Sequence, residues 1–264
     1  MSSKRRSLFA FFICFLFIQN PAYCLEPSIK SLNIKNPTHL LFIGNSYLYY
    51  NDSIHNHVRR MIEEAGLYTQ KELKFKSITI SGGALRDHPI EAYLKPGKLR
   101  IDRPFQFVIL QEGSALGWSK KRPRLFKKTV KYFSQKIIEA GAIPILYMTP
   151  AYATFHRRFD AAMTELLARR YVETGNAIRA MVIPVGLAFA EAYARRPDVR
   201  LHKDFDGSHP SLLGTYLAAC VVFTSLYETS PIGNSYDYFG KVKEPDAKFL
   251  QKVAFDTVKR FYGR

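Results

Sequence analysis

The sequence is poor in cysteine: only three of its 264 residues are cysteines. Cys14 and Cys24 lie within the first 24 residues, so Cys220 stands alone in the rest of the chain. One thiol can form neither an intramolecular disulfide nor a cysteine-based metal site, which excludes both for residues 25–264. Cys220 falls in the apolar run YLAACVVF, where we expect a small buried side chain.

The apolar run near the N-terminus is too short to span a bilayer comfortably, because Leu8–Ile18 has 11 residues. It follows the basic residues Lys4–Arg6 and precedes a small-residue end at Ala22–Cys24. This order is typical of a secretory signal peptide. We therefore expect residues 1–24 to be cleaved and residues 25–264 to form a single secreted or periplasmic domain. An uncleaved N-terminal membrane anchor is the alternative.

Acidic residues are scarce, since 22 Asp and Glu face 39 Lys and Arg, for a formal net charge of +17. No acid occurs from Gly113 to Ile138, and eight Lys or Arg lie between Lys120 and Lys136. This stretch is either a solvated basic face or a surface that attracts an anionic membrane or polysaccharide. A secreted destination and the lack of nucleic-acid recognition motifs argue against nucleic acid.

Short β-type runs alternate with amphipathic stretches along the chain. The runs cover residues 39–44, 73–80, 105–111, 142–149 and 181–186. Five such rounds predict an α/β fold with a central parallel sheet of about five strands and helices on both faces, a three-layer α/β/α sandwich.

Polar and glycine residues follow four of these expected strands. They are Asn45-Ser46, Gly82-Gly83, Gln111-Glu112 and Thr149-Pro150. In open parallel sheets the ligands lie outside the carboxyl ends of the strands. The sequence therefore predicts that these four loops share one functional edge.

Ser46 is a candidate nucleophile, which needs a base and a group that orients the base. His209 stands out among seven histidines because Asp206 precedes it by three residues across a glycine, in DFDGSHPSLLG. The Asp206 carboxylate can fold back onto the His209 imidazole and fix its tautomer. Alternatively, Asp206 and Ser208 only cap a long apolar helix, with Pro210 in its first turn.

These motifs, in this order, resemble the SGNH (GDSL-like) hydrolase superfamily, with this chain as a divergent member. The similarity spans about residues 38–230 and implies a flavodoxin-like sandwich. It implies that Ser46 is the nucleophile, His209 the general base and Asp206 its orienting acid. The backbone N–H groups of Ser46 and of Gly82 or Gly83 become the oxyanion donors, and no metal or organic cofactor is needed.

Two departures from the family pattern stand out. The Gly-Asp-Ser of the family is Gly-Asn-Ser here, through Asn45. The asparagine that the family usually places after the third strand, as a side-chain oxyanion donor, is absent, and Gln111 stands there instead. The Gln111 amide is expected to donate in its place. The alternative is that Gln111 and Glu112 only tie loops together.

The expected functional edge is rich in aromatic residues. Trp118, the only tryptophan, follows Gln111 and is the best candidate to contact a substrate, together with Asn45 and Glu112. The resemblance implies ester hydrolysis through an acyl-enzyme, with acetyl or short-chain esters of carbohydrate as the favoured substrates and lipid esters second. An O-acetyltransferase of the same superfamily is one alternative. An inactive basic protein that binds anionic surface polymers is the other.

Overall fold

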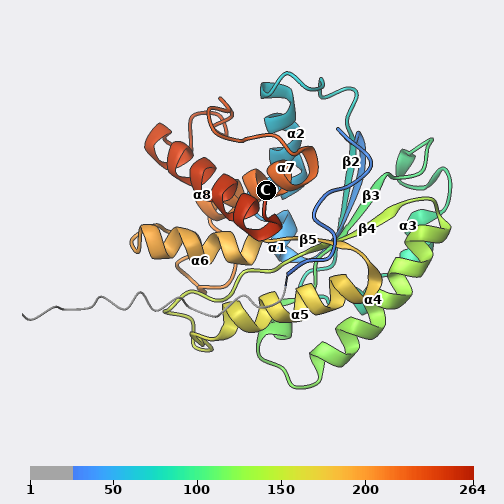
Figure 1. The fold of residues 1–264 in the computed structure, drawn as a ribbon, viewed down its shortest axis with the longest axis horizontal. Coiled ribbons are helices and arrows are strands. Elements are labelled where there is room, and N and C mark those ends of the chain that lie inside the picture. The colour runs from blue at the N-terminus through green and yellow to red at the C-terminus, as the bar shows by residue number, and fades with distance from the viewer. Residues whose placement is uncertain (1–25) are drawn as a thin grey trace, which may run out of the picture.

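The computed structural model describes residues 26–264 (Figure 1). The expected signal peptide at residues 1–24 lies outside the described residues. No helix within the described part of the chain is long and apolar enough to cross a membrane.

A parallel sheet of five strands forms the centre of the fold. Its strands are β1 (His39–Gly44), β2 (Lys74–Thr79), β3 (Phe107–Leu110), β4 (Ile143–Tyr147) and β5 (Met181–Ile183), in the order β2-β1-β3-β4-β5. All four strand pairs are parallel, and every expected β-type run contains one strand. This is the flavodoxin-like order, which reverses direction between β1 and β3. The fold expected from the sequence is therefore confirmed.

Helices cover both faces of the sheet (Figure 1). One face packs against α2 (Ile54–Glu64), α6 (Val185–Arg195), α7 (Leu212–Tyr227) and α8 (Glu244–Tyr262). The other face packs against α3 (Ile90–Leu94), α4 (Arg122–Glu139) and α5 (Met163–Ile178). Successive residues of β1 serve opposite cores, with Leu40 and Phe42 on the first face and Leu41 and Ile43 on the second.

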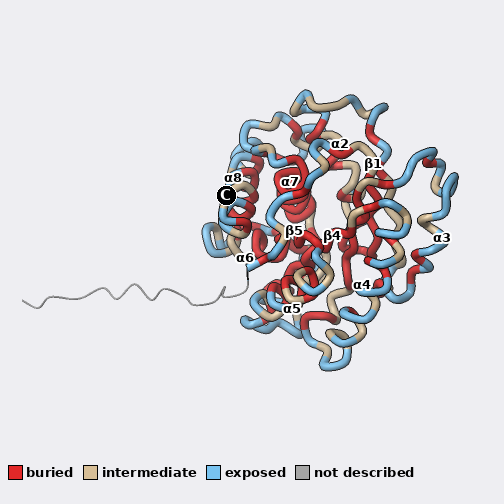
Figure 2. The backbone as a smooth tube through the Cα atoms, turned by 45° about the vertical axis from the view of Figure 1, so that its right-hand side comes forward, coloured by how far each residue is buried: buried red, intermediate tan, exposed pale blue. Residues whose placement is uncertain are grey.

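Helix α7 lies inside the molecule rather than on its surface (Figure 2). Every residue from Gly214 to Tyr227 is buried, including Cys220, which is a free thiol as expected. A helix that is apolar on all sides is stable in water only when other elements surround it. Helices α2, α6 and α8 provide that cover.

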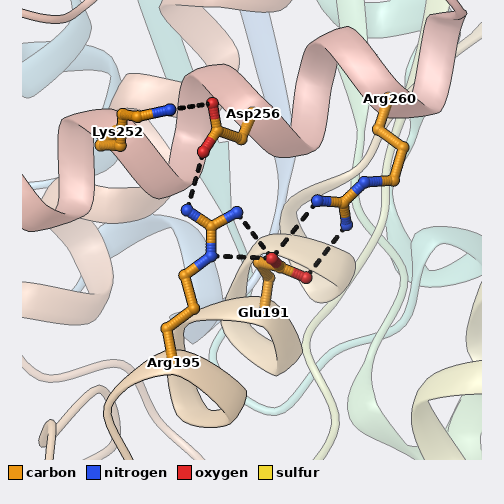
Figure 3. Close-up of polar contacts among 5 residues, drawn as sticks. All are labelled: Glu191, Arg195, Lys252, Asp256 and Arg260. Atoms are coloured by element: carbon orange, nitrogen blue, oxygen red, sulfur yellow. Dashed lines mark hydrogen bonds and ion pairs between the residues drawn. The ribbon is translucent and has the colours of Figure 1, made fainter. Parts of the chain in front are cut away.

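Charged side chains connect α6 to α8 at the surface (Figure 3). Glu191 of α6 pairs with Arg260 of α8 at 3.0 Å, and Arg195 of α6 pairs with Asp256 of α8 at 2.7 Å. Partly exposed pairs of this kind contribute about 0–1 kcal/mol each. The buried apolar residues between the two helices therefore dominate their packing.

Two details of the fold differ from the sequence expectation. A four-residue helix, α1 (Ser46–Tyr49), directly follows β1. Helix α7 begins at Leu212 and is capped by Ser211, whose hydroxyl accepts from the Gly214 N–H at 3.1 Å, so Pro210 does not lie in its first turn. The reason is that Pro210 pairs with His202 in an isolated antiparallel bridge.

Candidate active site

The candidate nucleophile lies at the junction between β1 and α1. Asn45 caps α1 through its side-chain oxygen, which accepts from the Tyr47 N–H at 3.2 Å. Gly44, just before the cap, has no room for a side chain, because a Cβ there would lie 2.8 Å from Leu48 Cδ1 and would also overlap the Gln111 amide. Glycine at position 44 thus allows the Leu48 and Gln111 side chains to pack directly against the backbone just before Ser46.

Ser46, His209 and Asp206 form a continuous chain of hydrogen bonds. The Ser46 hydroxyl lies 2.8 Å from Nε2 of His209. Nδ1 of His209 is hydrogen-bonded to Oδ2 of Asp206. The structure therefore brings together the three residues that the sequence singled out, although 163 positions separate the serine from the histidine.

The Asp206 carboxylate is held in its charged form. Burial opposes its ionisation, but hydrogen bonds from the His209 ring and from the N–H groups of Ser208 and His209 lower the pKa of Asp206 overall. Those backbone bonds measure 2.9 Å and 3.1 Å to Oδ1. A carboxylate held in this way favours the tautomer that leaves Nε2 of His209 free to accept a proton from Ser46. The alternative that Asp206 and Ser208 cap α7 is not what their contacts show, since Ser211 is the cap.

The loop that carries Asp206 and His209 is closed at its base. The His209 carbonyl accepts from the Lys203 N–H at 2.7 Å, next to the bridge between His202 and Pro210. Gly207 has a φ of +62° and its carbonyl accepts from the Ala153 N–H at 2.8 Å. Neighbouring segments therefore fix both the base and the tip of the loop.

Asn51 joins the serine segment to the histidine segment. Its side-chain amide nitrogen lies 3.0 Å from the Pro210 carbonyl, 2.9 Å from the Ser211 carbonyl and 2.8 Å from the Thr215 hydroxyl. The preceding residue, Tyr50, places its ring 4.6 Å from the His209 ring, centroid to centroid. The sequence analysis missed this contact, because nothing in the residues around Asn51 identifies partners about 160 positions away.

The expected backbone donors differ in their hydrogen bonding. The Gly83 N–H donates to the Ile80 carbonyl at 3.0 Å. Within residues 26–264, neither the Ser46 N–H nor the Gly82 N–H donates to another group of the chain. Gly82 has a φ of +67°, which favours glycine. Of the two glycines, Gly82 is therefore the better candidate for an oxyanion donor beside Ser46.

The Gln111 side chain ties loops together. It is fully buried, its oxygen accepts from the Asn45 N–H at 2.9 Å, and its nitrogen donates to the Glu112 carbonyl. These contacts differ from the expected role as an oxyanion donor. Because Gly44 has no side chain, the Gln111 amide packs against its backbone and bonds to Asn45. They match the alternative considered for Gln111 in the sequence analysis.

Asn45 and Glu112 are buried to about the same degree as Ser46, with 4%, 3% and 6% of the three residues exposed. Asn45 Nδ2 donates to the Gly83 carbonyl at 2.8 Å, which connects the serine loop to the glycine loop. A Glu112 carboxylate oxygen accepts from the Gly113 N–H at 2.9 Å, and desolvation raises the pKa of this carboxyl group. The hydrogen bonds of both side chains thus support the loops around Ser46.

Trp118, the candidate contact residue from the sequence, is 46% exposed. Its indole N–H donates to the Tyr152 hydroxyl at 3.2 Å, and the Arg158 guanidinium lies 4.0 Å from its ring centroid. Tyr152 in turn stacks on His156 at 3.7 Å. The indole is held in place by its neighbours while much of its surface stays open to solvent.

No cluster of three or more His, Cys, Asp or Glu side chains that could hold a metal ion occurs in residues 26–264. The arrangement around Ser46 can instead support nucleophilic chemistry, with a hydroxyl, an adjacent imidazole, an ionised carboxylate and backbone N–H groups.

No protein-family model matches the chain, and comparison with curated proteins gives no match. Solved structures do match it. A DUF4886 family protein from Bacteroides uniformis has a TM-score of 0.67 at 19% identity, over 83% of this chain and 93% of that one. A protein from Slackia heliotrinireducens assigned to the SGNH hydrolases has a TM-score of 0.54 at 20% identity, over 72% and 99%. The acetyl xylan esterase AlAXEase has a TM-score of 0.56 at 13% identity, over 71% and 98%. The chain therefore has the fold of the SGNH and GDSL-like hydrolases.

Proposed function

We propose that the protein hydrolyses esters through an acyl-enzyme formed on Ser46. The hydrogen-bond chain from Ser46 through His209 to Asp206 carries the proposal, because it joins a hydroxyl to a base whose orientation is fixed. Structural similarity to SGNH and GDSL-like hydrolases supports the same reaction class.

In the first half of the reaction, Nε2 of His209 accepts the Ser46 hydroxyl proton while the serine oxygen attacks the ester carbonyl. The N–H groups of Ser46 and Gly82 stabilise the oxyanion that forms. The carbon–oxygen bond to the alcohol then breaks, and His209 gives its proton to the departing alcohol. A water molecule repeats the sequence on the acyl-enzyme, which releases the acid and restores Ser46.

Acetyl and short-chain esters of carbohydrate are the proposed substrates. Trp118 supports this choice, because a fixed and exposed indole offers a flat face for a sugar ring. One of the similar structures is an acetyl xylan esterase. We propose further that residues 25–264 act as one catalytic domain after removal of the signal peptide, in a secreted or periplasmic location.

Labelling of residues 25–264 with a fluorophosphonate probe, followed by peptide mass spectrometry, tests the proposal. The label should appear on Ser46, and p-nitrophenyl acetate should be hydrolysed. Ser46→Ala should abolish both signals, whereas Ser235→Ala, a change at an exposed serine, should leave both intact. Full turnover by Ser46→Ala would contradict the mechanism. Salt-sensitive binding to an anionic polymer, without turnover of acetyl, butyryl or octanoyl esters, would favour the inactive binding protein.

A further inference from the structure

A cavity of about 730 Å³ opens beside the candidate active site. It lies beyond the carboxyl ends of β4 and β5, between the segment that follows β4, the first half of α6 and the connection from α6 to α7. This is the same edge of the sheet on which Ser46 follows β1. Its volume falls within the range of ordinary small-molecule sites, about 300–1,000 Å³.

The cavity shares a wall with the loop that carries Asp206 and His209. Ala153 lines the cavity and donates its N–H to the Gly207 carbonyl at 2.8 Å. Phe155 lines it too, and its ring is so close to Gly207 that a Cβ there would lie 2.9 Å from the ring. A molecule in this cavity would therefore be separated from the candidate triad by one thin loop.

Aromatic rings form much of the lining. Phe155 and Phe159 line the cavity and are 59% and 45% exposed, so both rings are open to a ligand. Phe189 forms a buried part of the wall, and Tyr193 is held by a 2.7 Å hydrogen bond between its hydroxyl and Nδ1 of His202. These rings offer flat apolar faces at fixed positions.

Three carboxylates complete the lining, those of Asp160, Asp198 and Asp204. The one guanidinium among the lining residues, that of Arg200, is paired with Asp204 at 2.9 Å. The cavity is thus locally acidic in a chain of net charge +17. Negative charge disfavours an anionic ligand, and exposed carboxylates are poor neighbours for a fatty acyl chain. Aromatic faces beside hydrogen-bond acceptors instead suit a sugar ring, which has apolar C–H faces and hydroxyl donors.

We propose that this cavity is a subsite for a neutral pyranose ring, one residue along the glycan that carries the ester attacked by Ser46. The inference rests on the proposed function and adds to it the place where the sugar chain lies and the neutral charge of the ring bound there. Binding in the cavity would hold the glycan across the loop between Lys203 and His209, so a longer substrate would gain affinity that a small ester lacks.

Phe159→Ala tests the subsite, because Phe159 lines the cavity and is 45% exposed. Phe239→Ala is the matched control, since Phe239 is an equally large exposed ring that does not line the cavity. Each variant is assayed with p-nitrophenyl acetate, with p-nitrophenyl octanoate as a long-chain acyl ester, and with acetylated xylo-, manno- and cello-oligosaccharides. We expect Phe159→Ala to raise KM for at least one oligosaccharide by about 2- to 12-fold, the loss of one ring contact, with p-nitrophenyl acetate unaffected.

A binding measurement separates this proposal from the reaction mechanism. Calorimetry with the deacetylated oligosaccharides on the Ser46→Ala protein should show binding that Phe159→Ala weakens, whether or not the wild type turns over esters. Absence of turnover with p-nitrophenyl acetate would contradict the proposed ester hydrolysis but not the sugar subsite. No binding of any of the three oligosaccharides, or equal KM values for wild type and Phe159→Ala, would overturn the subsite. A loss confined to long-chain acyl esters would do the same and would identify the cavity as an acyl site.

Discussion

Asn51 should control the alignment of Ser46 with His209. The amide has two hydrogens for three nearby acceptors, so its removal costs the equivalent of about two hydrogen bonds, or roughly 1–3 kcal/mol of folding stability. Asn51 also has a φ of +54°, where alanine is disfavoured by about 1–2 kcal/mol and glycine is not. Asn51→Ala should therefore be less stable than Asn51→Gly by about 1 kcal/mol, and both should be less stable than the wild type.

Activity should fall along with stability, because Asn51 bonds directly to the residues that follow His209. A shift of about 1 Å between reacting groups can cost about 100-fold in rate. We expect kcat of Asn51→Gly with p-nitrophenyl acetate to fall about 10- to 100-fold, with KM changed less than about twofold, because the contacts to a small ester are intact. Thermal melting and steady-state kinetics measure the two effects separately.

Asn56→Ala is the matched control for this experiment. The Asn56 side-chain amide donates to the Asp52 carbonyl at 2.9 Å and to the Asp52 carboxylate at 3.2 Å, both outside the His209 segment. Its substitution should leave kcat within about twofold of the wild type, as expected of a surface side chain. Asn51→Gly with wild-type kcat would refute the reasoning, since the side-chain contacts would then be irrelevant to alignment. Reduced stability with unchanged kcat would give Asn51 a purely structural role.

Three further predictions follow from the geometry. Ser46→Ala and His209→Ala should each reduce acetyl-ester turnover at least about 10³-fold, while the melting temperature stays close to that of the wild type. Near-normal turnover in either variant would exclude a catalytic role for the hydrogen-bond chain. Gly44→Ala should destabilise the protein by about 1–3 kcal/mol through overpacking, whereas Gly66→Ala, which has no atom within 4 Å of the new Cβ, should show only the cost of its positive φ and keep full activity. Burial lowers the pKa of His202 to about 4, so between pH 6.5 and 4 the unfolded chain binds the extra proton and stability falls with falling pH. Melting scans should show that decline. His202→Asn should make it less steep but not remove it, because burial also lowers the pKa of His55 to about 4. Equal slopes in both proteins would contradict the role of His202.

The sheet could be predicted because its strands are buried on both faces. Such strands appear in the sequence as continuous apolar runs, and five runs separated by amphipathic stretches leave little choice of architecture. The short helix α1 could not be predicted in this way. Its four residues contain less than two turns of periodic pattern, and its cap at Asn45 is also consistent with a simple turn.

The candidate triad could be predicted because its spacing is local on the histidine side. Asp206 and His209 lie three positions apart, so the sequence itself brings the carboxylate to the ring. Gln111 shows the opposite case. Its place after β3 suggested an oxyanion donor. Its actual partner, Asn45, depends on how closely the Gln111 side chain approaches Gly44, and these residues lie far apart in sequence.

Asn51 illustrates the same limit. Asn, Asp and Ser at positions 51–53 are residues that tolerate turns, and all three have positive φ, but the sequence does not say what the turn is for. The function of the turn depends on the Pro210 and Ser211 carbonyls, which only the folded chain brings near.

Because 163 positions separate Ser46 from His209, their hydrogen bond forms late when the chain folds from its N-terminus. A chain that folds from its N-terminus has all five strands by Ile183, yet His209 follows only after α6, and α7 must still enter the centre of one layer. A truncated or partly folded chain can therefore contain the complete sheet and an exposed serine while it lacks the paired histidine. In such a protein, fluorophosphonate reactivity would serve as a sensor of completed folding rather than of strand formation.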